Sequence, residues 1–404
     1  MDSEPGDFSA EFRLIWICVV AVAVGAICAA VAAALLALIA FFTNLFYYQE
    51  LSIVARSPAV FEDGKLHLLG AWTILVPVAG GLIIGLMARF GSERIRGHGI
   101  PEAIEAILIG QSRMQPKVAL LKPISSAISI GSGGPFGSEG PIIMTGGAVG
   151  SIIAQMFRMS SVERKTLLVA GAAGGMSATF NAPVTAVLLA VELLLFEWKP
   201  RSLIPVALAS TVAALLRPFF LHESGPIWAV EAHGALSAEA IFSAAFVGLT
   251  GGMLSILLTA AVYRAEDAFK RLPIHWMWWP AIGGLVVGIG GYFEPRALGV
   301  GYDIIKELLN GDRMAYALIM LIVVKGLIWS IALGSGTSGG VLAPLLIMGC
   351  ALGALESRFL PGGDARLWPL VGLAAILGGT MRAPLTGVLF ALELTHDVGA
   401  LPAL

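Results

Sequence analysis

The feature that most constrains this chain is a series of long stretches that contain no Asp, Glu, Lys or Arg. A helix needs about 20 residues to cross the hydrocarbon core of a bilayer, and most of these stretches reach that length. They cover residues 14–49, 66–88, 123–138, 140–157, 166–191, 240–263, 272–293 and 326–355. Charged residues make up 13% of the 404 residues, against about 25% in soluble domains. The sequence therefore predicts an all-α, polytopic protein of the cell membrane, which in a bacterium is the inner membrane.

The charge-free stretches differ in length and in glycine content. Residues 14–49 exceed a single crossing, which predicts a helix that tilts or protrudes. Residues 123–138 and 140–157 are short and rich in glycine, which indicates broken helices.

Composition also limits the partners that the chain can have. The acidic N-terminus, residues 1–13, lacks the basic segment of a signal peptide and is predicted to be cytoplasmic. A net charge of −2 argues against a nucleic-acid partner. Cys18, Cys28 and Cys350 lie inside apolar stretches without a metal-ligand spacing, so we expect buried packing residues and no metal or cofactor.

An internal repeat organises the sequence. Residues 131–150 read GSGGPFGSEGPIIMTGGAVG, and residues 334–353 read GSGTSGGVLAPLLIMGCALG, at an offset of 203. FNAPVTAVLLAVEL (180–193) matches MRAPLTGVLFALEL (381–394) at an offset of 201. Upstream, the pair Gly97 and Gly99 matches Gly299 and Gly301 at an offset of 202. Several matches at a nearly constant offset indicate duplication rather than a chance likeness of glycine-rich helices.

Loop charge predicts that the two copies have opposite topology, because cytoplasmic loops are enriched in Lys and Arg. The segment before the first copy contains Arg89, Arg94 and Arg96 and is predicted to be cytoplasmic. Residues 218–239 contain no Lys or Arg and are predicted to be external. The basic segment 264–271 returns the chain to the cytoplasm, so the second copy starts outside. Inverted repeats with interrupted helices are typical of transporters that bind solute near the midplane.

This topology predicts four segments. They are a cytoplasmic N-terminus (1–13), a first membrane repeat (14–201), connecting helices (202–271) and a second membrane repeat (272–404).

Glu139 stands in GSGGPFGSEGP, between apolar stretches that carry no charge. It comes just before the predicted helix 140–157, whose first turn holds Gly140 and Pro141. Unpaired N–H groups and a partial positive charge make a helix N-terminus a site for anions. Glu139 is therefore interpreted as a carboxylate that occupies an anion site and could leave it when protonated. A capping carboxylate without a role in transport is the alternative, although an ionisable residue inside a membrane favours function.

Three motifs in order resemble those of the CLC family of chloride channels and proton-coupled chloride antiporters. They are GHGIP (97–101), GSEGP (137–141) and GVLAP (340–344), followed by FNAP-like segments in both copies. The resemblance implies a homodimer in the lipid bilayer with one pore per subunit, a CLC-type inverted repeat of broken and tilted helices, and no enzymatic activity. It also implies that the chain lacks the last two helices of the family.

The same resemblance implies a set of site residues. Glu139 would be the gating glutamate, whose side chain competes with anions for the pore. The anion-binding residues would be His98, Gly99, Ile100, Glu139, Gly140, Val341 and Leu342, mainly through backbone amides.

The chain departs from the family pattern at each motif. His98 replaces a serine, and either its imidazole faces the anion and makes the site pH-sensitive, or the ring points away and the backbone acts by itself. Ser138 replaces an arginine, which removes a charge close to the gate, and Leu342 replaces a phenylalanine.

A second acid carries protons in many antiporters of the family, and the matching stretch here is AVELLLF. Glu192 aligns with the first acid of the pair and is a candidate for a proton path, whereas Leu193 stands at the proton-transfer position. Glu393 is the repeat counterpart of Glu192, which favours a structural role at a helix end. We therefore expect a voltage- or pH-gated chloride channel. A chloride/proton antiporter and a fluoride or nitrate transporter are the alternatives.

An intramembrane serine protease is a competing interpretation of the GSGG and GSG segments, with Ser132 or Ser335 as nucleophile. Such an enzyme needs a base on a facing helix. Most of the candidate bases stand at the edges of apolar stretches or in loops, and they are His98, His222, His233, His275 and His396.

The predicted topology can be tested by cysteine labelling from each side of the membrane. We expect residues 89–96 to react from the cytoplasm and residues 218–239 from outside. Labelling of residues 89–96 from outside would contradict the inverted arrangement of the two copies.

Overall fold

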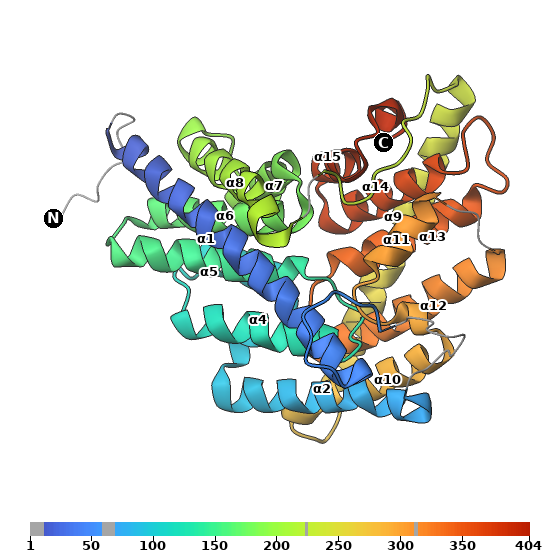
Figure 1. The fold of residues 1–404 in the computed structure, drawn as a ribbon, viewed down its shortest axis with the longest axis horizontal. Coiled ribbons are helices and arrows are strands. Elements are labelled where there is room, and N and C mark those ends of the chain that lie inside the picture. The colour runs from blue at the N-terminus through green and yellow to red at the C-terminus, as the bar shows by residue number, and fades with distance from the viewer. Residues whose placement is uncertain (1–11, 59–68, 223–224, 311–313) are drawn as a thin grey trace. The chain divides into compact units, whose positions relative to one another are not determined.

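The computed structural model describes residues 12–58, 69–222, 225–310 and 314–404, and within these the chain is helical (Figure 1). The described residues form no β-strand; they contain two isolated β-bridges. The prediction of an all-α protein is confirmed. The α-helices are α1 (Phe12–Thr43), α2 (Leu75–Leu86), α3 (Ile100–Leu108), α4 (Pro116–Gly131), α5 (Glu139–Met156), α6 (Ser161–Phe180), α7 (Pro183–Leu189), α8 (Pro200–Leu221), α9 (Ala238–Lys270), α10 (Trp279–Phe293), α11 (Tyr302–Asn310), α12 (Ala315–Gly334), α13 (Leu342–Glu356), α14 (Leu367–Met381) and α15 (Pro384–Thr395).

The chain forms two compact units. The first unit comprises the described parts of residues 1–35, 99–123 and 141–225. The second comprises the described parts of residues 36–98, 124–140 and 226–404. These units are defined by compactness and do not follow the repeat boundaries, so the division into four sequence segments stays a prediction. Most of its first segment, residues 1–11, lies outside the described residues.

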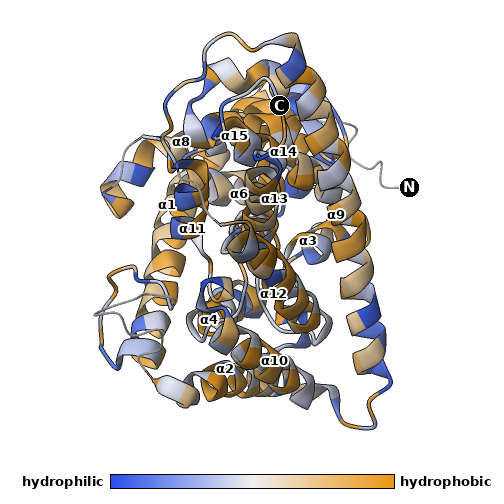
Figure 2. Ribbon diagram, turned by 90° about the vertical axis from the view of Figure 1, so that its right-hand side faces the viewer, coloured by the Kyte–Doolittle hydropathy of each residue, from blue (hydrophilic) through white to orange (hydrophobic). Residues whose placement is uncertain are grey.

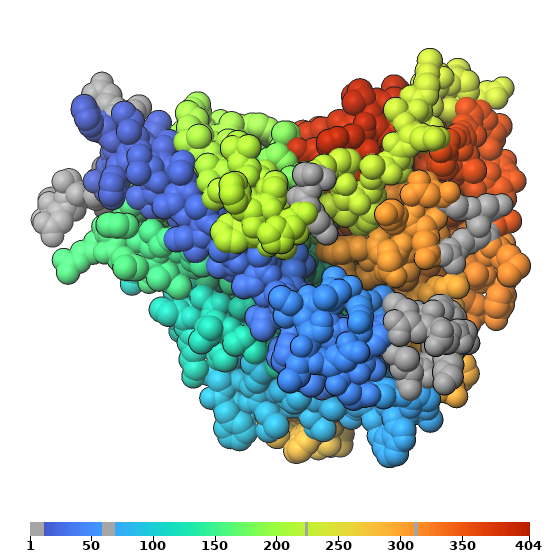
Figure 3. Space-filling view, in the orientation of Figure 1, coloured from blue at the N-terminus to red at the C-terminus, as the bar shows by residue number. Residues whose placement is uncertain are grey.

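In the first unit, helices α5 and α6 pack closely through glycines. A Cβ on Gly146 would lie 2.3 Å from the carbonyl oxygen of Gly171, and one on Gly150 would lie 1.9 Å from that of Leu167. Small residues of this kind let membrane helices approach backbone to backbone. Helix α8 of this unit lies on the face shown in Figure 3. Leu215 and Phe219 on this helix are exposed.

The second unit repeats this packing between α13 and α14. A Cβ on Gly349 would lie 2.4 Å from the carbonyl oxygen of Gly372, and one on Gly353 would lie 2.0 Å from that of Trp368. Gly349 and Gly353 are the counterparts of Gly146 and Gly150 at the offset of 203. The repeated sequence therefore builds the same helix pair in each unit.

Helices α2 and α10 of the second unit show the symmetry of the repeat most directly. A Cβ on Gly81 would lie 2.3 Å from the carbonyl oxygen of Pro280, and one on Gly284 would lie 2.3 Å from that of Pro77. Both pairs are related by the offset of 203, so the contact is reciprocal. Reciprocal contacts of this kind define a two-fold relation between two copies. The repeat thus extends to helices that the sequence comparison did not include.

Within the described ranges, five helices are long and apolar enough to cross a membrane, among them α9 and α12. Figure 2 shows apolar colouring along most of α9, with polar residues at the end that carries the basic segment 264–271. Phe242, Leu249 and Ile256 recur on α9 at helical spacing and are exposed by 78%, 64% and 73%. Large apolar side chains in such a row suit contact with lipid rather than water.

The long apolar stretch 14–49 forms α1, which ends at Thr43, and continues as a π-helical segment, Asn44–Tyr48, so the helical span is longer than a single crossing requires, as predicted. Cys28 and Cys350 are buried as predicted, but the expectation for Cys18 is wrong, because its side chain is half-exposed on α1.

Candidate functional site

The second unit brings together backbone from all three sequence motifs. The N–H of Gly97 donates to the carbonyl of Thr337 at 3.0 Å. Gly137 and Gly340 exchange two hydrogen bonds, of 3.1 and 2.9 Å, as an isolated antiparallel bridge. Residues that are 240 and 203 positions apart in the sequence are therefore joined by main-chain hydrogen bonds.

Glycines are required where these segments meet. A Cβ on Gly137 would lie 1.7 Å from Oε2 of Glu139, and one on Gly140 would lie 1.8 Å from the carbonyl oxygen of His98. A Cβ on Gly340 would lie 3.0 Å from the same Oε2. The Glu139 carboxyl group thus lies directly over the backbone of two motif glycines, where any side chain would displace it.

Glu139 is the first residue of α5, so this helix begins one position earlier than the sequence predicted, and the side chain is fully buried. Its Oε1 accepts a hydrogen bond from the hydroxyl of Tyr302 at 2.9 Å. The backbone N–H groups of Glu139 itself and of Ala343 interact favourably with the carboxyl group. Oε2 has no partner of hydrogen-bond geometry among the described residues. The carboxyl group is therefore held at the N-termini of both α5 and α13.

Sequence reasoning missed two of these partners, Tyr302 and Ala343. Tyr302 begins α11 and also lies 3.3 Å from the Ser138 hydroxyl, measured between the two oxygens. It follows Gly299 and Gly301, so it is the repeat counterpart of Ile100 at the offset of 202. Ala343 is likewise the counterpart of Gly140. Applying the repeat to the predicted site residues would have pointed to both positions.

The first motif crosses the boundary between the two units. His98 belongs to the second unit and is half-buried, whereas Gly99 and Ile100 belong to the first. Gly99 has a φ of 96° and caps α3, and its N–H donates to Oε2 of Glu102 at 2.6 Å. An anion at the Gly99 amide would have to replace this bond. In the third motif, Val341 precedes α13, and Leu342 is its first residue and fully buried.

Comparison with known proteins agrees with this arrangement. The family model described as "Voltage gated chloride channel" matches residues 80–404. The chain belongs to the CLC family. It is accordingly a multi-pass membrane protein built for anion transport, and the recognition made from the three motifs is confirmed.

Individual CLC relatives differ in their stated activities. A ClcB-like chloride channel protein of Ralstonia nicotianae is 31% identical over 333 residues, covering 80% of this chain and 77% of the relative. The H(+)/Cl(−) exchange transporter ClcA of Vibrio vulnificus is 30% identical over 355 residues, covering 82% and 74%. The structure of a CLC-type fluoride/proton antiporter superposes with a TM-score of 0.83 at 17% identity, covering 98% of this chain and 95% of that chain, which shows the shared fold.

Glu192, the candidate for a proton path, lies in the first unit. Glu192 is half-buried in the π-helical turn Ala190–Leu195 that follows α7, and Leu193 beside it is also half-buried. Its repeat counterpart, Glu393, is half-buried in the last turn of α15. The equivalent placement of Glu192 and Glu393 at two helix ends fits the structural role that the sequence favours for Glu192.

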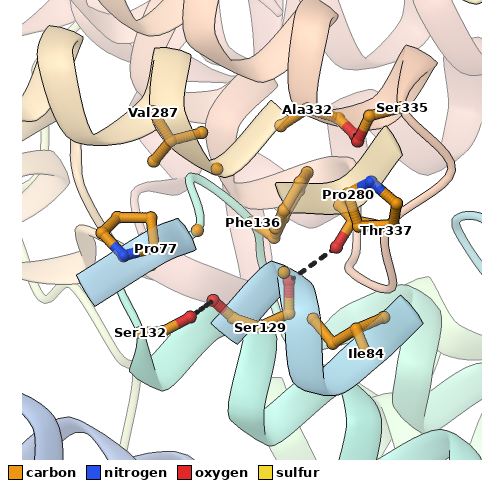
Figure 4. A pocket seen from close by; sticks show the side chains of 13 residues that line it. Pro77, Ile84, Ser129, Ser132, Phe136, Pro280, Val287, Ala332, Ser335 and Thr337 are labelled. Carbon is orange, nitrogen blue, oxygen red and sulfur yellow. Dashed lines mark hydrogen bonds between the residues drawn. The ribbon is translucent and has the colours of Figure 1, made fainter. Parts of the chain in front are cut away.

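Ser132 and Ser335, the candidate protease nucleophiles, line a small cavity of the second unit (Figure 4). The Ser132 hydroxyl donates to the Ser129 carbonyl at 3.0 Å, and the Ser335 hydroxyl donates to that of Ala332 at 2.6 Å. The lining residues include no His, Lys, Asp or Glu. Both hydroxyls thus bond to their own chain segments rather than to a base, which counts against the protease interpretation.

A substitution at His98 separates the two roles that the sequence leaves open for it. His98→Ser is expected to change the order of preference among chloride, nitrate and fluoride if the imidazole faces the anion, because it removes an N–H donor. Anion-replacement flux in liposomes measures this order. His98→Ala with an unaltered order would show that backbone groups select the anion.

Proposed function

We propose that this chain carries chloride or a similar small anion passively through a pathway that Glu139 gates. The observation that carries the proposal is the buried Glu139 carboxyl group, held where the N-termini of α5 and α13 and the Tyr302 hydroxyl meet. Each of these groups is a donor or a partial positive charge directed at one point.

A carboxylate at such a point acts as a tethered anion. It satisfies the donors that a free anion would use, so the free anion can bind there once the carboxylate has left. Protonation removes the negative charge and weakens the charge-assisted hydrogen bonds that hold the side chain in place. The proposed gate therefore opens more often as the pH falls.

The passive mode is supported by Leu193, because a leucine cannot pass protons from the inner side to Glu139. Chloride/proton exchange is the second candidate, and the likeness to the exchange transporter of Vibrio vulnificus favours it. Exchange would need water in place of the missing acid, or Glu192 as the inner proton acceptor.

The identity of the anion is a separate question, since backbone amides bind any small anion. Chloride is proposed from the family model and the ClcB-like relative. Fluoride and nitrate are the alternatives. Fluoride is included because a CLC-type fluoride/proton antiporter has the same fold.

Each subunit of the proposed homodimer would hold its own pathway in the bilayer. The donors to Glu139, its glycine floor at Gly137 and Gly340, and the Tyr302 hydroxyl all come from one chain. No residue of a second subunit is needed to complete the gate described above.

Replacing the gate tests the proposal directly. Glu139→Gln imitates the protonated side chain, so anion flux in liposomes should rise and lose its pH dependence. A rise of roughly tenfold or more is expected, because a hydrogen bond to a charged group contributes about 1.5–3 kcal/mol. Unchanged flux and unchanged pH response would refute the gating role of Glu139.

Proton coupling is decided in liposomes that have a chloride gradient, no pH gradient and no other ion pathway. We expect chloride to move down its gradient without proton movement once a potassium ionophore clamps the voltage. If protons are driven against their electrochemical gradient, the channel proposal fails and chloride/proton exchange takes its place.

A further inference from the structure

The Tyr302 hydroxyl has a defined direction. It donates its single proton to Glu139 Oε1 at 2.9 Å, and its oxygen lies 3.3 Å from that of Ser138. A phenol has one proton to donate and lone pairs to accept with. Because the proton of Tyr302 is directed to Glu139, the bond to Ser138 must run from the serine to the tyrosine. Ser138 thus orients the Tyr302 proton toward the gate.

Tyr302 is fixed in place by its surroundings in the second unit. Its backbone carbonyl accepts a hydrogen bond from the Trp228 indole N–H at 3.1 Å, and the two rings meet edge to face at 5.8 Å. Trp228 is 1% exposed, and its own backbone N–H donates to the carbonyl of Leu394 at 2.9 Å. The aromatic position therefore does not depend on the bond to Glu139.

The turn before Tyr302 is held as well. Gly299 and Gly301 have φ angles of 63° and 75°, which favour glycine. The ammonium group of Lys325, which is fully buried, donates to the carbonyls of Ala297 and Gly299 at 3.1 and 3.4 Å. This turn keeps the start of α11, and with it the Tyr302 side chain, at a set distance from the gate.

A fixed donor stays behind when Glu139 leaves. The hydroxyl of Tyr302 and the N–H of Ala343 would then point at the place that the carboxylate has left, and they would still favour a negative charge there. We propose that the Tyr302 hydroxyl is a ligand of the transported anion at the gate, donating to Glu139 in the closed state and to the anion in the open state. This inference rests on the proposed gating role of Glu139.

The assignment makes the two copies of the repeat unequal at this point. The first copy has Ile100 where the second has Tyr302, so the side-chain donor comes from the second copy. A single hydroxyl donor favours small anions that concentrate their charge, such as fluoride and chloride, over nitrate, which spreads its charge over three oxygens. Tyr302 would therefore determine selectivity as well as gating.

Anion binding in a chain without the gate carboxylate isolates this role. Isothermal titration of the purified full chain with chloride, fluoride and nitrate would compare Glu139→Gln with the double variant Glu139→Gln/Tyr302→Phe. Loss of the hydroxyl should weaken chloride and fluoride binding roughly tenfold or more, the effect of one hydrogen bond to a charged group. Nitrate binding should weaken less. Equal chloride affinity and an unchanged order of anions in the two variants would overturn the inference.

A matched control is available on α12. Tyr316 is 74% exposed, so Tyr316→Phe in the Glu139→Gln background removes a tyrosine hydroxyl remote from the gate and should leave chloride affinity unchanged.

If Tyr302→Phe does not give a folded protein, Ser138→Ala in the Glu139→Gln background tests the inference instead. It keeps the ring and removes the hydroxyl that orients the Tyr302 proton, so chloride affinity should fall by a smaller factor. Unchanged affinity in Ser138→Ala would then count against the inference.

Flux measurements separate this inference from the proposed function. Tyr302→Phe by itself should raise anion flux, because the closed gate loses a hydrogen bond, and should not raise it further once Glu139 is Gln. If Glu139→Gln changes neither flux nor its pH response, the gating proposal fails. If Glu139→Gln opens the gate but Tyr302→Phe alters neither anion binding nor flux, the proposal for Tyr302 fails and the gate remains.

Discussion

The rest of this structure depends on one constraint, the burial of a carboxyl group within an apolar chain. A buried carboxylate is costly unless donors surround it, and Glu139 is fully buried. The N-termini of α5 and α13 and one hydroxyl group offset part of this cost, while Oε2 has no partner of hydrogen-bond geometry among the described residues. These donors are not specific to a carboxylate, and any small anion can use them. The arrangement that stabilises the buried Glu139 carboxyl group would therefore also bind an anion in its place, as the proposed gate requires.

Close backbone packing makes that arrangement possible. The carboxyl group lies over Gly137 and Gly340, and these two residues are joined by a pair of hydrogen bonds. Elsewhere in the same unit, glycines on α2 and α10 let the helices meet at backbone distance. Within a membrane, such packing has to replace the hydrophobic effect as the force that holds helices together. Many of the glycines in the repeat thus serve helix packing, and a few serve the site.

The duplicated sequence builds equivalent helices, and the functional side chains stand at positions where the two copies differ. At the offset of 203, Glu139 corresponds to Leu342, so the two equivalent helix N-termini share one acid. At the offset of 202, Ile100 corresponds to Tyr302, so one copy contributes a hydroxyl and the other a hydrocarbon. A fully symmetric pair would place two acids or none at the same point. In the proposed gate, this asymmetry leaves one carboxyl group to move while the donors stay in place.

The sequence by itself determined the class of the protein, the repeat, the family and the position of Glu139 at the start of a helix. These are local or periodic features: charge-free length, glycine spacing and the residues that begin a helix. Tertiary structure decided which groups face Glu139. Tyr302 lies 163 positions away from it, and Trp228, which fixes Tyr302, lies in a different segment again. Those contacts depend on how several helices pack, and packing of distant segments leaves no periodic signal along the chain. The repeat carried part of that information, because the counterparts of the predicted site residues Ile100 and Gly140 are Tyr302 and Ala343, which face Glu139.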